Sequence, residues 1–336
     1  MPAAPSFWKR RGPTAAFFLP LSYLFGFLAG LRRTLYDLGV LKTYRVGVPV
    51  VVVGNIAVGG SGKTPVVLWL ADRLVRAGRR PGIVSRGYGG SAQGCQAVLA
   101  ESDPATSGDE PVLLARRSRC PVWIGRDRVA AAQALRRAHT EVDVILTDDG
   151  LQHYRLARDI EIAVVDDRQL GNGLLLPAGP LREPLSRLAG CDMVLAHGEL
   201  SPEVRAICPP APIYRMQLMP TAFYRLGQPL RRRSAGEFEG MRVRAIAGIG
   251  RPERFFDTLS ELGLEGFERR ALPDHHVFKP EDVRLDGVDA IVVTEKDAVK
   301  LRAFAPEETW VLPVDAEIRE EAFEYLLERL NGCKAA

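Results

Sequence analysis

Residues Val53–Val67 read "VGNIAVGGSGKTPVV", which is the most informative stretch of this chain. It joins an apolar run, "VPVVVVGN", to a segment with apolar residues at helical spacing, "GKTPVVLWLADRLVRAG". A valine-rich run that is apolar on both faces is typical of a parallel strand covered by helices. A strand, a glycine-rich turn and a helix N-terminus form a phosphate cradle, because backbone N–H groups and the helix dipole both favour an anion.

This loop predicts a nucleotide site. Lys63 is expected to reach the β- and γ-phosphates, and the Thr64 hydroxyl to bind Mg²⁺. The loop departs from the general pattern at Ala57, where a glycine usually stands five residues before Gly62. The alternative interpretation is a glycine-rich turn that binds nothing. The remaining glycines, which still allow the turn and are predicted to bind the nucleotide, are Gly59, Gly60 and Gly62.

Composition restricts the class of protein. A chain of 336 residues suggests about two domains, and its 46% apolar and 26% charged residues are ordinary for a globular protein. The net charge of +4 fits an anionic substrate or a membrane surface and is too weak to indicate nucleic acid. The five cysteines show no paired spacing, so we expect free thiols in a reducing compartment.

The N-terminal region carries no charged residue between Arg11 and Arg32 and is strongly apolar. It is just long enough for a transmembrane helix, but Pro20 and the basic residues on both flanks disfavour a simple span. No small-residue cleavage site of a signal peptide is visible before Arg32, and few polar residues are present to form the solvent face of a core helix. We therefore predict a helix or helix pair in the membrane interface, with its basic flanks near anionic headgroups.

The rest of the chain alternates between strand and helix patterns, which indicates a mostly parallel sheet. We predict an α/β fold: a P-loop-type, mostly parallel sheet with helices on both faces, a smaller α/β second domain and the N-terminal apolar helix. A proline-rich stretch, Cys208–Pro212, is interpreted as a hinge. The predicted boundaries are 1–35 for the membrane-interface anchor, 36–212 for the P-loop domain, 213–240 for a linker, either extended or a hairpin, and 241–336 for the smaller domain.

The stretch "VDVILTDDGLQH" is the second informative motif. It places Asp148 and Asp149 at the end of a predicted strand, where an acidic residue of a nucleotide-loop protein binds Mg²⁺ directly or through water. The alternative is a solvated turn, since Asp-Asp-Gly favours turns. The phosphate loop in the same predicted sheet favours the metal site.

Four further motifs contribute polar side chains near the predicted crevice. "SGDEP" has two carboxylates before a predicted helix, which could also be a helix cap without function. "PDHHVF" offers His275 beside Asp274 as a proton-handling group, although most histidines are structural. The candidate residues of the four motifs are Arg86 and Tyr88 of "SRGYGG", Asp109 and Glu110 of "SGDEP", Arg182 and Glu183 of "GNGLLLPAGPLREP", and His275.

Taken together, these motifs resemble tetraacyldisaccharide 4'-kinase, the lipid A 4'-kinase of Gram-negative bacteria. The resemblance rests on GNxxxGGSGKTP, SRGYGG, GDEP, TDDGLQH, GNGxLLPAGPLREP, DHHxF and VTEKDAVK in this order, and it extends from the apolar N-terminus to about Lys300. It implies ATP and Mg²⁺, a two-domain fold with the site in the cleft, and transfer of the γ-phosphate to the 4'-hydroxyl of an acylated glucosamine disaccharide 1-phosphate. It also implies the cytoplasmic face of the inner membrane, with no nucleic acid and no obligate protein partner.

The resemblance also implies roles for individual residues. Asp109 would be the base for the acceptor hydroxyl, with His275 as its partner from the second domain, and Lys63 and Arg182 would offset phosphate charge. Ser61 would lie at a phosphate. The substrate cleft would be lined by Arg86, Tyr88, Glu110, Gln152, His153 and Glu183, and the metal side formed by Thr64, Asp148 and Asp149.

Two other functions remain open at this point. A membrane-associated P-loop nucleotide switch would share the loop and the aspartates, but it needs no acceptor and no cleft between two domains. A soluble metabolite kinase or ligase would use the N-terminal segment only as a packing helix.

Overall fold

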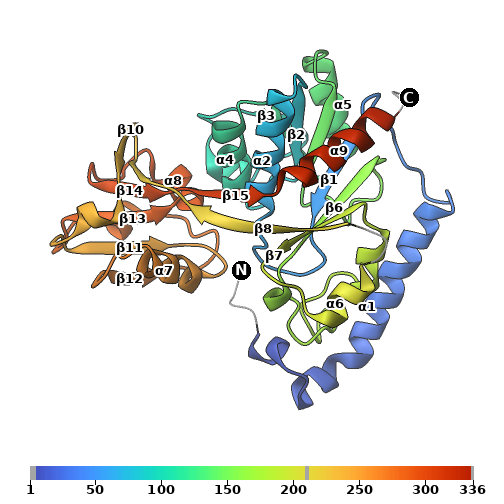
Figure 1. Cartoon of the computed structure of the whole chain (residues 1–336), viewed down its shortest axis with the longest axis horizontal. Coiled ribbons are helices and arrows are strands. Elements are labelled where there is room, and N and C mark those ends of the chain that lie inside the picture. Colours follow the sequence, from blue (N-terminus) through green and yellow to red (C-terminus); the bar gives the residue numbers. More distant parts are fainter. Residues whose placement is uncertain (1–4, 209–211, 334–336) are drawn as a thin grey trace.

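The computed structural model describes residues 5–208 and 212–333, which form a large α/β domain, a smaller α/β domain and an N-terminal helix (Figure 1). The large sheet has nine strands in the order β15-β8-β7-β6-β1-β5-β2-β4-β3. At its centre, β1 (Val50–Gly54) pairs in parallel with β5 (Val144–Asp148) and β6 (Ile160–Val165), and all five residues of β1 are buried. The phosphate loop therefore starts from a fully buried strand at the centre of the sheet.

Only the two edge strands run antiparallel to their neighbours, so the predicted mostly parallel sheet is confirmed. Parallel strands align their carboxyl ends at one edge, and the loops that follow them can share one site. The other strands of this sheet are β2 (Pro81–Ser85), β3 (Gln96–Val98), β4 (Val122–Ile124), β7 (Met193–His197), β8 (Ile213–Pro220) and β15 (Val314–Ile318).

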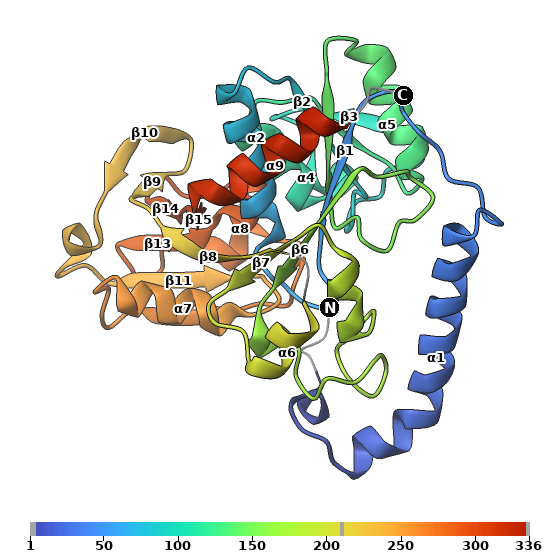
Figure 2. The ribbon, with the colours of Figure 1, turned by 45° about the vertical axis from the view of Figure 1, so that its right-hand side comes forward.

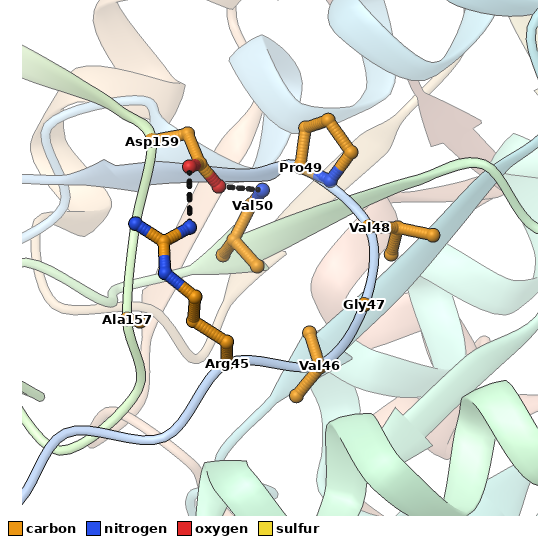
Figure 3. A pocket seen from close by; sticks show the side chains of 8 residues that line it. All are labelled: Arg45, Val46, Gly47, Val48, Pro49, Val50, Ala157 and Asp159. Atoms are coloured by element: carbon orange, nitrogen blue, oxygen red, sulfur yellow. Dashed lines mark hydrogen bonds and ion pairs between the residues drawn. The ribbon is translucent and has the colours of Figure 1, made fainter. Parts of the chain in front are cut away.

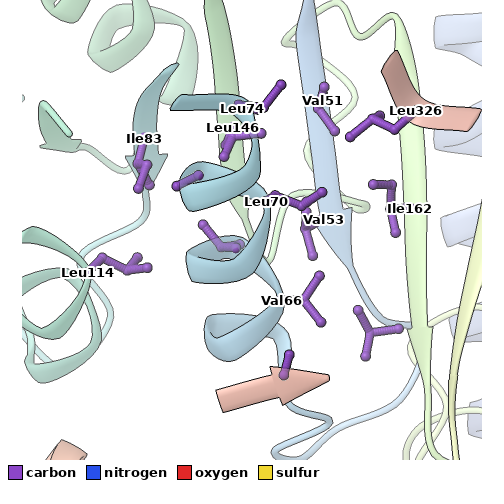
Figure 4. Packing of buried hydrophobic residues seen from close by; sticks show 14 of the residues in the cluster. Val51, Val53, Val66, Leu70, Leu74, Ile83, Leu114, Leu146, Ile162 and Leu326 are labelled. Carbon is purple, nitrogen blue, oxygen red and sulfur yellow. The ribbon is translucent and has the colours of Figure 1, made fainter. Parts of the chain in front are cut away.

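Helices cover both faces of this sheet. On one face, α2 (Lys63–Arg76) and α9 (Glu320–Gly332) bring apolar side chains to the valines of β1, and α4 (Asp109–Ser118) adds Leu114 to the same cluster (Figure 4). On the other face, α5 (Arg128–Ala138) packs a second apolar cluster. Shorter helices of this domain are η1 (Ser6–Lys9), α3 (Pro104–Ser107), η2 (Asp167–Gln169), η3 (Leu185–Gly190) and α6 (Pro202–Ile207).

The smaller domain has a six-stranded sheet in the order β10-β9-β14-β13-β11-β12. Strands β14, β13, β11 and β12 pair in parallel. The remaining two strands, β9 and β10, form an antiparallel hairpin at the β14 side of the sheet. Its elements are β9 (Phe223–Arg225), β10 (Gln228–Arg233), η4 (Ala235–Phe238), β11 (Val243–Ala247), α7 (Pro252–Glu261), β12 (Glu268–Ala271), η5 (Pro280–Val283), β13 (Ala290–Thr294), α8 (Glu295–Leu301) and β14 (Thr309–Leu312).

The domain boundaries differ from those predicted. Residues 213–240 are not an extended linker, because β8 joins the large sheet. The hairpin alternative is present in this segment, where β9 and β10 pair antiparallel in the small sheet. The C-terminal residues 314–332 return to the large domain: β15 pairs with β8, and Phe323 and Leu326 of α9 pack in the large core. The chain therefore passes from the large domain to the small one after β8 and returns before β15. These two connections lie side by side, and the Thr221 amide donates to Pro313 O at 3.0 Å. The predicted hinge at Cys208–Pro212 falls mostly on residues outside those described.

The N-terminal helix α1 (Pro13–Asp37) lies on the outside of the large domain, away from the small domain in both views (Figures 1 and 2). It continues as one helix through Pro20, so the apolar segment forms a single helix. Its apolar side chains are largely exposed, and only 11% of its most apolar window is buried. By length and composition alone, it is apolar enough to cross a membrane.

Candidate active site

The phosphate loop connects β1 to α2 in a conformation that requires glycine. Gly62 precedes α2 with φ +87°, and a side chain there would meet Leu218 of β8 at 3.1 Å. Gln169, which follows β6, also stabilises the loop, because its Nε2 donates to Gly60 O at 2.7 Å. The Oγ of Ser61 is buried and has no hydrogen-bond partner. The loop is thus a preformed cradle with an unused polar group, as a phosphate site requires.

Asp148 and Asp149 follow β5 directly and have opposite environments. The Asp149 backbone has φ +52°, and its carboxylate lies 3.5 Å from Lys63 Nζ and 2.9 Å from Arg182 Nη1. Burial opposes ionisation of Asp149, but these two cations outweigh it and lower the pKa of the carboxyl. Burial, followed by the nearby Glu110 charge, raises the pKa of Asp148 to about 7. Arg128 fixes this turn by donating to the carbonyls of both aspartates.

The donor set near the loop fits a magnesium ion. Asp148 Oδ1 is buried and has no hydrogen-bond partner, which is costly unless a cation or proton neutralises it. Within residues 5–208 and 212–333, no three His, Cys, Asp or Glu side chains group together as a metal cage. Mg²⁺ bound with a nucleotide needs none, because it takes one or two protein oxygens and completes its shell with phosphates and water. The unpartnered Asp148 oxygen is a ligand of this kind, so the residues present fit such a site.

Arg182 is held against the phosphate loop by backbone pairing. The Arg182 amide donates to Ile56 O at 2.7 Å, and the Val58 amide donates to Pro180 O at 2.9 Å. The guanidinium reaches both carboxylate oxygens of Asp149, at 3.1 and 2.9 Å. A cation is thereby placed at the start of the loop, where it can act on phosphate oxygens.

Asp109 and His275 meet across the domain boundary. Asp109 begins α4 of the large domain and is 4% exposed, and His275 Nδ1 lies 3.1 Å from its Oδ2. The His275 backbone has φ +59°, a conformation that is uncommon outside glycine and often occurs at functional sites. Burial opposes ionisation of Asp109, but the His275 hydrogen bond and the charges of Lys296 and Lys300 lower the pKa of this carboxyl.

Two lysines of α8 belong to this cluster, and neither was among the site residues predicted from the sequence. Lys296 Nζ lies 3.2 Å from Glu110 Oε1, 3.3 Å from Asp274 Oδ1 and 3.5 Å from His275 Nε2. Lys300 Nζ lies 3.7 Å from Asp109 Oδ2. An ammonium group can only donate, so a hydrogen bond from Lys296 to His275 Nε2 leaves Nδ1 to carry the proton that faces Asp109. Both lysines lie in the VTEKDAVK motif, but the spacing of this motif alone does not indicate that they lie near Asp109.

The remaining predicted residues divide into two groups. Tyr88 lies at the domain boundary, with its ring 5.2 Å from that of His275, and Arg86 is exposed beside it. The others lie inside the large domain: Glu183 is 6% exposed and accepts hydrogen bonds from Gln152 and Tyr154. Burial lowers the pKa of His153 to about 4, with Arg128 and Arg158 adding to the shift. Glu183 is thus buried, whereas Gln152 and His153 are half-buried, and Gln152 donates to Asn55 O at the start of the phosphate loop.

A cavity of about 430 Å³ opens at the carboxyl ends of β6, β7 and β8, next to the phosphate loop. Its wall contains Asp166, His197 and Leu218, the last of which also lies against Gly62. Arg254 of α7 reaches His197 across the domain boundary at 2.9 Å. A second, much smaller pocket lies at the opposite edge of the sheet, where Asp159 binds Arg45 and the Val50 amide (Figure 3). It is remote from the loop.

Comparison with known proteins agrees with this geometry. A family model described as tetraacyldisaccharide-1-P 4'-kinase matches residues 14–331. Tetraacyldisaccharide 4'-kinases of Azoarcus sp. (strain BH72) and Aromatoleum aromaticum are each 54% identical to this chain, over 98% of it and 96% and 97% of their own lengths. A crystal structure of LpxK from Aquifex aeolicus in complex with ATP is similar at a TM-score of 0.78 and 30% identity, covering 94% of this chain and 99% of its own.

The family match spans both domains and all the motifs from the phosphate loop to α8, so the resemblance stated from the sequence is confirmed. The chain belongs to the tetraacyldisaccharide-1-phosphate 4'-kinase family.

Proposed function

We propose that this protein transfers the γ-phosphate of ATP to the 4'-hydroxyl of a tetraacyldisaccharide 1-phosphate, with Asp109 as the base. The observation that carries the assignment of the base is the Asp109–His275 contact of 3.1 Å, which forms across the two domains. A nucleotide switch has no need of such a pair, because it has no acceptor hydroxyl to deprotonate. An acceptor kinase does, since the hydroxyl proton must leave as the oxygen attacks phosphorus.

The nucleotide side of the site is formed by the large domain. Lys63 and the loop amides would bind the β- and γ-phosphates, and Arg182 would offset charge on the γ-phosphate. A magnesium ion held by Thr64 and the Asp148 carboxylate would neutralise charge on the phosphate oxygens. The 430 Å³ cavity beside Gly62 is large enough for the nucleoside, and it lies at the strand ends where α/β sheets bind ligands.

On the acceptor side, Asp109 takes the proton of the 4'-hydroxyl. The new bond joins the hydroxyl oxygen to the γ-phosphorus, and the bond from that phosphorus to the β–γ bridging oxygen breaks, which releases ADP. His275 Nδ1 donates to the Asp109 carboxylate and keeps it oriented and ionised beforehand. Because Asp109 is 4% exposed, the acceptor reaches it when the small domain moves, and renewed closure excludes water.

The acceptor carries acyl chains, and α1 offers a surface that matches their location. Phe17, Tyr23 and Phe27 are 79%, 72% and 66% exposed on this helix, which is unusual for aromatic side chains in water. Basic residues flank α1 on both sides. We infer that α1 lies in the membrane interface as a peripheral or monotopic anchor, on the cytoplasmic face where ATP is available.

Phosphate transfer distinguishes the kinase from the switch. Full-length protein is supplied with ATP labelled at the γ-phosphate and a tetraacylated glucosamine disaccharide 1-phosphate in mixed micelles, and free phosphate is measured in parallel. We expect label in the lipid that depends on Mg²⁺ and is lost in Lys63→Ala together with ATP affinity. Label that appears only as free phosphate, with acceptor present, would favour the switch.

A further inference from the structure

One side of α1 faces the large domain and makes hydrogen bonds and close packing contacts with a single loop. Ser22 is 4% exposed although its neighbour Tyr23 is 72% exposed. The Ser22 hydroxyl donates to Leu175 O at 2.9 Å and accepts from the Ala178 amide at 2.9 Å. One turn further along, Gly26 lies so close to Leu175 that an added Cβ would come within 2.6 Å of its Cδ1. This is close docking of the helix onto a loop, beyond what membrane attachment requires.

The residues before and at the start of α1 hold the same loop at further points. Trp8 Nε1 donates to Pro177 O at 2.9 Å, and Arg11 Nε donates to Asn172 O at 3.1 Å. Asn172 Nδ2 in turn donates to Phe7 O at 3.2 Å. The N-terminal segment thus fixes the first half of the Gly- and Pro-rich loop, whose side chains cannot form a core of their own.

The other end of this loop is part of the active site. Leu181 bridges to Ala57 of the phosphate loop, and the next residue, Arg182, donates its amide to Ile56 O at 2.7 Å. The Arg182 side chain then binds Asp149. Only a few residues, 178–182, separate the peptide group bound by Ser22 from the guanidinium at the phosphate loop.

We propose that residues 172–181 form a strut between α1 and the phosphate loop, and that Ser22 is a positioning residue that acts through Arg182. Loss of the Ser22 hydroxyl leaves the buried Ala178 amide unpaired, so the strut must shift to satisfy it. A shift of about 1 Å at a catalytic group can lower a rate by about 100-fold. The inference rests on the proposed function of Arg182, and it makes α1 part of the site as well as a membrane anchor.

The test is a double-mutant cycle in the full-length protein, with turnover measured in mixed micelles that hold every variant equally. We expect Ser22→Ala to lower kcat by about tenfold and Ser22→Thr, which keeps a hydroxyl, to retain more of it. In an Arg182→Ala background, Ser22→Ala should change kcat by less than about twofold, because its target is already gone. Thr34→Ala removes an exposed hydroxyl from the same helix and serves as the matched control.

Two further measurements separate positioning from loss of folding or of membrane attachment. Ser22→Ala should sediment with vesicles of phosphatidylethanolamine and phosphatidylglycerol as wild type does, and should keep its unfolding temperature. If it does not fold, Gly26→Ala, which displaces Leu175, replaces it in the cycle. An unchanged kcat in the single variant, or a full tenfold loss that persists without Arg182, would overturn the proposal. Wild-type protein that transfers no label would instead refute the proposed kinase function.

Discussion

Two of the aspartate–histidine pairs in the part of the chain that the structure describes form through Nδ1 at nearly equal distances, and their surroundings differ. His275 Nδ1 lies 3.1 Å from Asp109 Oδ2, and His197 Nδ1 lies 3.3 Å from Asp166 Oδ2. The first pair forms between the domains. The second forms within one sheet, since Asp166 and His197 stand at the ends of the adjacent strands β6 and β7.

The neighbours of each carboxylate decide what it can do. Asp166 is bound by Arg168 through two hydrogen bonds, at 2.9 and 3.1 Å, and Arg254 lies 3.6 Å away. Guanidinium groups remain charged and occupy the carboxylate oxygens, so this pair is suited to hold a structure or an anion. Asp109 has two lysines and a histidine as neighbours, and the histidine can withdraw with the small domain. An aspartate–histidine pair is therefore informative only together with its neighbours.

The largest expected effect comes from removing the Asp109 carboxylate, and the same change at Asp166 is its comparison. Asp109→Asn should lower kcat by about 1,000-fold and leave ATP affinity near normal, because the acceptor loses its base. Asp166→Asn should lower kcat by less than about tenfold, with the change mainly in the KM for ATP. Steady-state kinetics in mixed micelles and ATP titration calorimetry check both. Lost ATP affinity in Asp109→Asn would assign that residue to the metal or to the structure instead.

Replacement of His275 and of His197 tests the same difference between the two pairs. His275→Ala should lower kcat by about 100-fold, since Asp109 loses the hydrogen bond that orients it. In the double variant with Asp109→Asn, little further loss is expected because the two act as a unit. His197→Ala is the matched control, and an equal fall in its kcat would show that the two pairs are not distinct in function.

A smaller effect is expected from the lysine behind the first pair. Lys296→Met should lower kcat by about tenfold, and Lys296→Arg by less, because a cation at this place helps to keep Asp109 ionised. Removing a positive charge raises the pKa of Asp109, so the acidic limb of the pH–kcat/KM profile should move to higher pH. Arg254→Met, which removes the comparable cation near Asp166, should leave that limb in place. A profile that does not move in Lys296→Met would contradict this role.

The smallest effect concerns His153, whose buried Nε2 has no hydrogen-bond partner among the residues that the structure describes. The pKa of His153 is about 4, below its value in the unfolded chain, so the unfolded state binds more protons between pH 6.5 and 4. The free energy of unfolding should thus fall as the pH drops through this range, by about 1 kcal/mol from His153 after allowance for solvent screening. Denaturant unfolding at pH 7 and 4.5 measures this, and His153→Gln should reduce the difference.

Much of the fold and site could be predicted where the evidence lies in neighbouring residues. The strand β1 and the helix α2 follow from the valine run, from apolar residues at helical spacing and from the glycine-rich turn between them. The phosphate loop and the Asp148–Asp149 turn follow the same rule, because strand, turn and helix start are all contained in about fifteen residues. The pairing of Asp109 with His275 was expected only through the family resemblance, since 166 residues separate them.

The sequence by itself determined the phosphate cradle, the acidic strand end, the apolar helix and the family, because each is encoded by local periodicity and by residue types with particular backbone or ligand preferences. Tertiary structure alone decided that β15 and α9 return to the large domain, that Lys296 stands behind His275, and that Ser22 supports the strut leading to Arg182. The physical reason is that these contacts join distant segments, and their partners are selected by complementary packing and hydrogen bonding that no local pattern records.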